Sequence, residues 1–220
     1  MKSTRARSIR LTVSDRGTRV TMPYWTPYLI AQQFVLGHAS WIQRQQAKKP
    51  TSLIQPGEKV GKLHHVELVR VPSTETISSR VTATKIIVKH HSSEDITGPV
   101  VQQRAHKAVL RALKKEGQQL LPPRIQRYAQ LHGLRYGTVE IKQLIRRWGS
   151  CDSKGNLTFN LYLMQLPWEL IDYVIFHELT HLTHLNHSAA FWELLVSYEP
   201  RARDLRRQIN TYRPIIQSEQ

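Results

Sequence analysis

Alternating apolar and polar residues in the first part of the chain predict four strands and one helix. The strands are expected at residues 8–13, 18–22, 63–71 and 80–89. A polar turn at residues 14–17 joins the first two strands, which therefore predict a β-hairpin. Thr26 and Pro27 predict the start of a helix that runs to about Lys48, because proline is favoured at the first helical position.

The rest of the chain predicts helices, then strands, then helices again. The helices are expected at residues 99–120, 124–132, 168–185, 189–197 and 201–212, and the strands at residues 138–148 and 157–164. Pro122 and Pro123 separate the first two helices, because proline removes a backbone donor and clashes with the preceding turn. Strands and helices in separate blocks are typical of an α+β fold.

A polar stretch at residues 90–98 is interpreted as a linker. It divides the chain into a small N-terminal region over residues 1–97, with the hairpin, helix and strands, and a second domain over residues 98–220. Residues 1–150 carry 26 Lys and Arg against 8 Asp and Glu, whereas residues 151–220 carry 6 against 8. The formal net charge of +16 thus belongs to the first part of the chain. This basic part either contacts nucleic acid or phosphorylated ligands, or only aids solubility.

Composition excludes several classes of protein. No run of about 18 uncharged apolar residues is present, so no membrane-spanning helix is expected. The basic residues at the N-terminus are not followed by an apolar stretch, which argues against a signal peptide. Cys151 is the single cysteine, so no internal disulfide forms and a reducing, cytoplasmic location is expected.

The pattern H-E-x-x-H occurs at residues 177–181, inside a predicted helix. Residues four apart on a helix lie on the same face, so His177 and His181 can converge on one metal ion. Glu178 lies beside this face and not on it. Its carboxylate can therefore act on water at the metal as a general base without becoming a ligand.

Two histidines compete for the place of the third metal ligand. His184 would lie about 10.5 Å along an unbroken helix from His177, too far for both to bind the same tetrahedral ion. His187 can reach the ion if the chain turns back, and Asn186 is a residue type that enters the left-handed conformation readily. Ser188 is expected to cap the next helix. The sequence therefore favours His187, and His184 is interpreted as solvated or as a support for another ligand.

Residues ahead of this motif add candidate substrate contacts. Arg146, Arg147 and Trp148 are the candidates, since a guanidinium presents a planar set of donors to a phosphate or a carboxylate. The alternative for the two arginines is a solvated strand end. Residues 148–151 are interpreted as a structural turn beside the site and not as a Ser or Cys nucleophile. The pairs His64-His65 and His90-His91 are interpreted as surface residues, because neighbours on a strand point to opposite faces.

Several segments together resemble the YgjP-like metallopeptidase family. These are Arg7 to Leu11, Trp41-Ile42, Arg147 to Cys151, Gly155, Asn160, Pro167, Ile171 to Val174, His177 to Leu179, Asn186 to Ser188 and Phe191-Trp192. The resemblance implies a zincin-like catalytic region related to SprT-like and Wss1-like proteases, in which the H-E-x-x-H helix packs on a short antiparallel sheet. It also implies that His177, His181 and His187 bind the metal and that Glu178 is the base.

The resulting prediction is a hydrolase with one Zn²⁺ ion, most simply a metallopeptidase that uses metal-activated water with Glu178 as general base. The family resemblance also leaves a nucleotide pyrophosphatase or a DNA-associated metalloprotease as alternatives. A non-catalytic nucleic-acid-binding module would not need Glu178. The expected partner is thus a peptide, a protein or a nucleotide, with nucleic acid contacted through the basic N-terminal region and no membrane involved.

Overall fold

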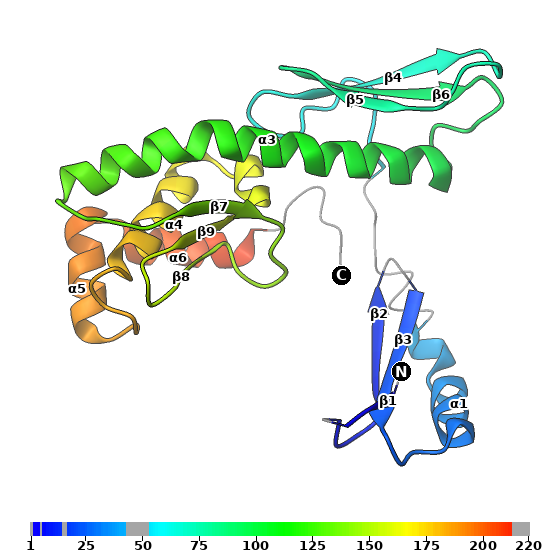
Figure 1. The fold of residues 1–220 in the computed structure, drawn as a ribbon, viewed down its shortest axis with the longest axis horizontal. Coiled ribbons are helices and arrows are strands. Elements are labelled where there is room, and N and C mark those ends of the chain that lie inside the picture. Colours follow the sequence, from blue (N-terminus) through cyan, green and yellow to red (C-terminus); the bar gives the residue numbers. More distant parts are fainter. Residues whose placement is uncertain (1, 5, 15–16, 43–52, 213–220) are drawn as a thin grey trace. The chain divides into compact units, whose positions relative to one another are not determined.

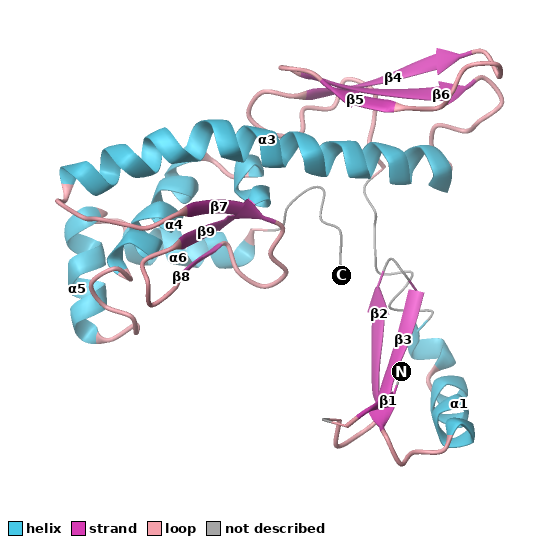
Figure 2. Ribbon diagram, viewed as in Figure 1, coloured by secondary structure: helices cyan, strands magenta, loops and turns pink. Residues whose placement is uncertain are grey.

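The computed structural model describes residues 2–4, 6–14, 17–42 and 53–212 (Figures 1 and 2). Its packing divides the chain into two units, with the boundary between Ser52 and Leu53. The boundary predicted between residues 97 and 98 falls inside the second unit, and the assignment of two domains there stays a prediction. No helix among the described residues is both long and apolar enough to cross a membrane.

The first unit contains a three-stranded sheet and a helix. Its strands are β1 (Lys2–Ser3), β2 (Arg10–Ser14) and β3 (Gly17–Pro23), in the order β1-β3-β2. Strands β2 and β3 are antiparallel, which confirms the predicted hairpin, and β1 is parallel to β3. Helix α1 (Tyr28–Gly37) follows directly after Pro27 and buries Ala31. Helix α1 ends at Gly37 with His38 as its C-cap residue, so the single helix predicted to about Lys48 is wrong, and Lys48 itself lies outside the described residues.

The second unit begins with a sheet that packs against one long helix. The sheet consists of β4 (His65–Val71), β5 (Ser79–Val81) and β6 (Lys85–His91), in the order β4-β6-β5. Strand β6 is parallel to β4 and antiparallel to β5. Val66, Ile86 and Val88 are fully buried on the side that meets α3 (Pro99–Leu131). The single strand predicted over residues 80–89 is therefore wrong, because a turn at residues 82–84 divides it into β5 and β6.

Helix α3 runs without a break through Pro122 and Pro123, so the predicted separation into two helices is wrong. Leu121, Ile125 and Ala129 repeat every four residues and are buried on the inner face of the helix. Burial of this apolar face stabilises the helix on both sides of the prolines and offsets the backbone hydrogen bonds that they remove. Tertiary packing thus overrides the local preference of the two prolines.

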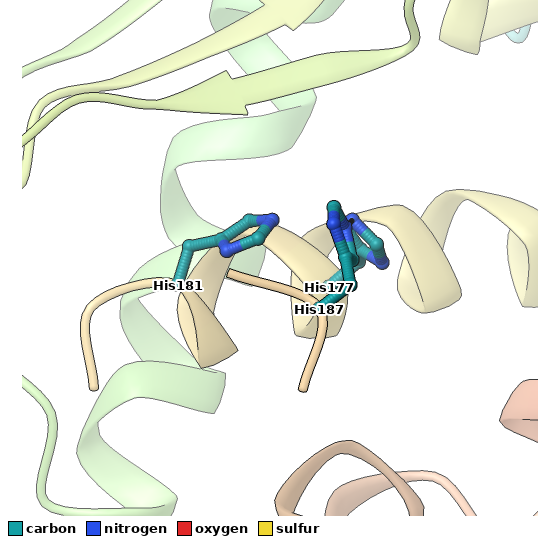
Figure 3. A group of neighbouring side chains, drawn as sticks. All are labelled: His177, His181 and His187. Carbon is teal, nitrogen blue, oxygen red and sulfur yellow. Dashed lines mark hydrogen bonds between the residues drawn. The ribbon is translucent and has the colours of Figure 1, made fainter. Parts of the chain in front are cut away.

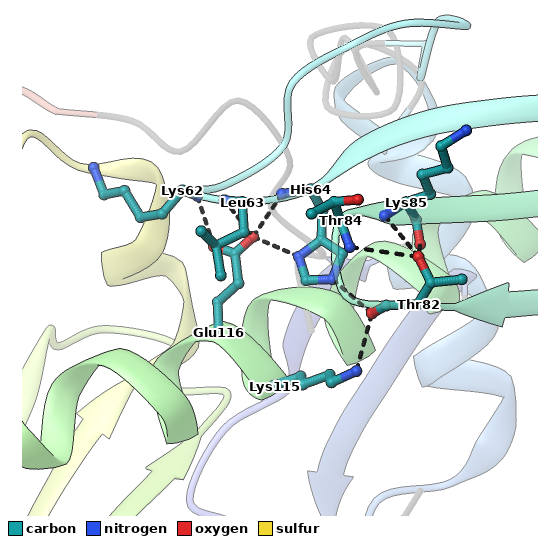
Figure 4. A network of polar contacts seen from close by, with 8 residues as sticks. All are labelled: Lys62, Leu63, His64, Thr82, Thr84, Lys85, Lys115 and Glu116. Atoms are coloured by element: carbon teal, nitrogen blue, oxygen red, sulfur yellow. Dashed lines mark hydrogen bonds and ion pairs between the residues drawn. The ribbon is translucent and has the colours of Figure 1, made fainter.

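The buried carboxylate of Glu116 on α3 binds the backbone of residues 62–64, which precede β4 (Figure 4). Glu116 accepts hydrogen bonds from the backbone N–H groups of Lys62, Leu63 and His64 at 2.6, 2.9 and 3.0 Å, and from His64 Nδ1 at 2.6 Å. His64 and Glu116 are both buried. The surface location predicted for the histidine pairs is therefore wrong for His64 and His90, which are buried, while His65 and His91 are half-exposed.

The second sheet of this unit lies beside the helices at the C-terminal end. Strands β7 (Val139–Lys142), β8 (Gly149–Cys151) and β9 (Leu157–Asn160) are arranged in the order β7-β9-β8. A short 3-10 helix, η1 (Leu161–Gln165), leads to α4 (Trp168–Thr180), α5 (Ala189–Tyr198) and α6 (Ala202–Thr211). The α+β prediction is confirmed. The short sheet is mixed and not wholly antiparallel, because β7 is parallel to β9 and only β8 is antiparallel to it.

Candidate metal centre

Helix α4 carries the H-E-x-x-H residues and is fixed by its apolar neighbours. It contacts β8, α5 and α6, and Ile171, Ile175 and Leu179 are fully buried in the core. The helix ends at Thr180, five residues earlier than predicted, with His181 as its C-cap residue. Because both histidines stay within helical geometry, they keep the four-residue spacing on one face that the sequence predicted.

The structure brings His177, His181 and His187 together (Figure 3). One possible ligand atom from each lies within 4.8 Å of the others. The Nε2 atoms of His177 and His187 are 3.0 Å apart. Two nitrogens bound to one tetrahedral zinc ion would be separated by about 3.3 Å, so this spacing is close to that of two ligands of a single ion. His184 is not part of the cluster.

His184 instead contributes its backbone to the site. Its carbonyl oxygen accepts a hydrogen bond from His181 Nδ1 at 2.9 Å. This bond places the ring proton of His181 on Nδ1 and leaves the lone pair of Nε2 available for a metal, as the outer partners of metal-binding histidines commonly do. The predicted choice of His187 over His184 therefore agrees with the positions of the two side chains.

The loop between α4 and α5 turns back without a left-handed residue. No described residue other than glycine has a positive φ, so the conformation expected for Asn186 is wrong. A turn stabilised by hydrogen bonds from the N–H groups of Thr183 and His184 to the Thr180 carbonyl oxygen reverses the chain. Ser188 caps α5 as predicted, since its side chain accepts from the Phe191 N–H.

Phe191 packs against all three imidazoles from α5. Its ring centroid lies 5.0, 4.7 and 4.7 Å from those of His177, His181 and His187, and the residue is fully buried. Burial and the neighbouring His181 and His187 lower the pKa of His177 to about 3. Burial also lowers the pKa of His187. Both side chains are thus neutral near pH 7, which is the form that binds metal.

Glu178 lies in a dry environment beside this cluster. Only 4% of its surface is exposed, and its Oε2 atom has no hydrogen-bond partner among the described residues. Burial raises the pKa of Glu178 to about 8, and the charge of Arg147 opposes that shift. A buried carboxylate oxygen without a partner is rare in folded proteins and marks a position that a ligand or a substrate completes.

The residues before β8 are held in place by Asn160. Its Nδ2 atom donates to the carbonyl oxygens of Leu144 and Arg147 at 2.8 and 2.9 Å. The charge of Arg147 acts on Glu178, whereas no side-chain contact is found for the exposed Arg146 among the described residues. Trp148 is half-buried and packs on the hydrophobic core. Of the three candidate substrate contacts, Arg147 is thus the one whose charge acts on Glu178, and the role of all three stays a prediction.

Three further groups with reactive side chains serve other purposes. Burial and the charge of Glu178 raise the pKa of the Cys151 thiol to about 11, so it stays protonated and is a poor nucleophile. The Tyr212 hydroxyl donates to the carbonyl oxygen of Gln165 at 3.0 Å. Tyr198 stacks on His132 with ring centroids 4.0 Å apart. The protonated thiol of Cys151 is consistent with the interpretation of residues 148–151 as a turn without a nucleophile, which stays a prediction.

Two residues near the cluster were not singled out from the sequence. Tyr173 lies one helical turn before His177, with ring centroids 5.9 Å apart, and its pKa is raised to about 12 by burial. Its phenol therefore remains a hydrogen-bond donor. The four-residue spacing could have identified Tyr173. Arg206 on α6 acts electrostatically on Tyr173, His177 and His187, and no local pattern in the sequence indicates that contact.

The side chains present fit a catalytic metal. Three neutral imidazoles are a common ligand set for catalytic zinc, which keeps one further position for water or substrate. The buried Glu178 carboxylate oxygen without a partner is unfavourable unless a further group occupies the centre. The described part of the chain thus contains one cluster of three histidines with the composition of such a site.

Comparison with known proteins gives a family and two partly similar structures. The family model of the YgjP-like metallopeptidase domain matches residues 7–212. The metallopeptidase zymogen abylysin of Pyrococcus abyssi has a TM-score of 0.37 at 25% sequence identity, over 40% of this chain and 89% of that chain. The zymogen jannalysin of Methanocaldococcus jannaschii has a TM-score of 0.35 at 22% identity, over 39% and 89%. No curated protein sequence matches. Because the family match extends over nearly all of its length, the chain belongs to the YgjP-like metallopeptidase domain family and is a metal-dependent hydrolase.

Proposed function

We propose that this protein is a peptidase that uses one zinc ion, held by His177, His181 and His187, with Glu178 as the general base. The observation that carries the proposal is the Glu178 carboxylate, which is buried beside the three imidazoles and has one oxygen without a partner in the described structure. A structural metal site would need no such carboxylate. A carboxylate that acts as a general base has to lie within reach of the attacking water and be shielded from bulk solvent.

The residues of the chain divide the chemistry between them. Zinc, when bound, supplies a Lewis acid that polarises the peptide carbonyl and makes water more acidic. Glu178 takes the proton of the attacking water and returns it to the leaving amine. Burial raises the pKa of Glu178 to about 8 in the metal-free site, and a divalent ion beside the carboxylate would lower it toward neutral pH, where the group can both take up and release a proton. The His184 carbonyl keeps the His181 ring in the orientation that exposes Nε2.

Strand β8 supports an extended peptide as the substrate. It lies at the edge of the sheet β7-β9-β8 and packs beside α4, and its three residues are half-exposed. An edge strand offers unpaired N–H and C=O groups, which bind the backbone of an extended chain. The position of β8 next to Glu178 would bring the bound backbone to the general base.

The same proposal includes nucleic acid as a partner of the first unit. Residues 1–52 carry nine Lys and Arg and one Asp. Tyr24, Trp25 and Tyr28 are exposed, and the Lys2 ammonium group lies 5.6 and 4.8 Å from the ring centroids of Tyr24 and Tyr28. Exposed rings among cations stack on the bases of single strands.

Binding of a fluorescent single-stranded oligonucleotide at several salt concentrations tests this contact. Trp25→Ala is expected to weaken binding about tenfold. Leu29→Ala is the control, because it removes an equally exposed side chain without an aromatic face. Equal losses in the two variants would argue against stacking. The cytoplasmic location expected from the single cysteine stays a prediction.

Metal analysis combined with a hydrolysis panel tests the proposed reaction. The purified protein is expected to contain one equivalent of zinc and to cleave unstructured peptides. The panel also contains a DNA-bound protein and nucleoside triphosphates. Release of pyrophosphate from nucleotides without peptide cleavage would contradict the proposal and favour the pyrophosphatase alternative.

A further inference from the structure

Two arginines of α6 lie over the same tryptophan ring of α5. The guanidinium carbons of Arg203 and Arg206 are 5.4 and 4.8 Å from the centroid of Trp192. Both arginines are exposed, and neither forms an ion pair within the described part of the chain. Their neighbours differ in this respect, since Arg201 pairs with Glu169 and Arg207 pairs with Asp204.

This arrangement is continuous with the candidate metal centre. Trp192 meets Phe191 edge to face, with ring centroids 5.7 Å apart, and Phe191 is the residue that packs on all three imidazoles. Helix α6 itself contacts α4 and α5. Arg206 is thus connected to the metal-binding side chains through the rings of Trp192 and Phe191.

The unpaired guanidinium groups of Arg203 and Arg206 have the properties of an anion-binding site. Like charges three residues apart destabilise a helix. A divalent ion held by three neutral imidazoles would make the surroundings more positive still, and the Glu178 carboxylate compensates only part of that charge. The cation–π contacts with Trp192 position the two guanidinium groups and leave their N–H donors available for a ligand. Guanidinium donors bind carboxylates with charge-assisted, often bidentate hydrogen bonds.

We infer that Arg206, together with Arg203, forms a carboxylate-binding subsite that selects peptide substrates with a carboxylate near the scissile bond. The inference rests on the proposed peptidase function and adds its substrate class. The carboxylate can be the C-terminus of the peptide or an acidic side chain. Both sources offer the same chemistry to the two guanidinium groups, so the experiment has to separate them.

Three peptides of otherwise identical sequence separate these sources. One ends in a free carboxylate, one is amidated and neutral, and one is amidated with a glutamate introduced next to the cleaved bond. The values of kcat and KM for each are compared in the wild-type protein and in Arg206→Gln, Arg206→Lys and Arg207→Gln. Arg207 is a matched control because it is an exposed arginine of the same helix that already has a partner.

The wild-type protein is expected to prefer one of the two acidic peptides about tenfold in kcat/KM, mainly through KM. Arg206→Gln is expected to remove this preference, so that the three peptides react with similar kcat/KM values. Arg206→Lys is expected to restore part of it, and Arg207→Gln to retain all of it. Equal rates for the three wild-type reactions, or an equal loss for all peptides in Arg206→Gln, would overturn the inference.

A binding measurement tests the carboxylate subsite independently of peptide hydrolysis. Calorimetry on Glu178→Gln measures the affinity for the same three peptides without turnover. We expect an acidic peptide to bind about tenfold more tightly than the neutral one, and this difference to be lost when Arg206→Gln is added. Such a result supports the subsite even if the wild-type protein cleaves none of the three peptides. In that case only the proposed peptidase function fails. Equal affinities for acidic and neutral peptides would refute the subsite even if peptides are cleaved.

Discussion

The carboxylate of Glu178 lies against the backbone of Gly149. A methyl group on Gly149 would lie 2.6 Å from Oε1 of Glu178 and 2.7 Å from its Cγ atom. Such distances are shorter than any van der Waals contact, so a side chain at this place in β8 would force Glu178 or the strand to move. The glycine in the segment 148–151 thus lets the carboxylate of Glu178, the proposed general base, take its position.

Gly149→Ala is therefore expected to displace Glu178. The methyl group forces either the carboxylate or β8 to move, and a shift of about 1 Å at a reacting group costs up to about a hundredfold in rate. We expect kcat to fall 10- to 100-fold while zinc remains bound, measured by peptide hydrolysis and metal analysis. Gly37→Ala is the control, since no atom lies within 4 Å of the added methyl group. An unchanged kcat in Gly149→Ala would show that Glu178 is not positioned by this contact.

Glu178→Gln is expected to abolish hydrolysis and to leave zinc binding intact. Glutamine has nearly the same shape but cannot accept a proton, and the metal ligands are three other side chains. The loss in kcat should be at least about a thousandfold, as for other groups that transfer protons in the transition state. Parallel measurement of metal content and peptide cleavage checks both parts. Retained activity would exclude Glu178 as the base, and loss of zinc would mean that it supports the ligands.

His187→Ala and His184→Ala are expected to differ in metal content. His187 contributes its ring to the cluster, whereas His184 contributes only its backbone carbonyl oxygen. Removal of the His187 ring leaves two ligands, so the zinc equivalent should be lost on dialysis. His184→Ala keeps its carbonyl and should keep the metal. Mass spectrometry of the two dialysed variants measures the zinc that each retains. Loss of zinc in His184→Ala alone would mean that His184, and not His187, is the third ligand.

The sequence predicted the histidine cluster well because most of it is local. The spacing of His177 and His181 follows directly from helical geometry, and His187 required only that the chain turn back after α4. The conformation of that turn was not predictable in detail. Hydrogen bonds to Thr180 form it, and the residue expected to adopt a left-handed conformation, Asn186, does not.

Contacts between distant segments could not be derived from one sequence. Glu116 and His64 lie 52 residues apart, and neither belongs to a recognisable motif, so the burial of this pair was missed. The continuous α3 was missed for a similar reason. Its inner face is buried by other elements, and that packing outweighs the local effect of Pro122 and Pro123. The α+β class was predictable because it depends only on the order of strands and helices.

The stability of the metal-free protein should reveal the burial of Glu178. Its pKa rises from an ordinary value of 4.5 to about 8 on folding, so the folded protein binds the proton more tightly than the unfolded chain. Between these two values the unfolded chain has already lost the proton, and the stability contributed by Glu178 therefore decreases as the pH rises through this window. Glutamine at this position does not ionise, so its contribution to stability does not decrease as the pH rises.

Metal-free Glu178→Gln is consequently expected to gain stability over the wild-type protein as the pH rises from 5 to 8.5. The pH-dependent part of this gain should rise from about 1 kcal/mol at pH 5 to about 4–5 kcal/mol at pH 8.5, since folding raises the pKa from 4.5 to about 8 and each unit of pKa shift corresponds to about 1.4 kcal/mol. Urea denaturation of the chelated proteins at several pH values measures it. The opposite pH dependence of the buried His177 is present in both proteins and cancels in the difference. Glu193→Gln, at an exposed position of α5, controls for the loss of a carboxylate. A difference between Glu178→Gln and wild type that stays constant with pH would mean that folding does not raise the pKa of Glu178.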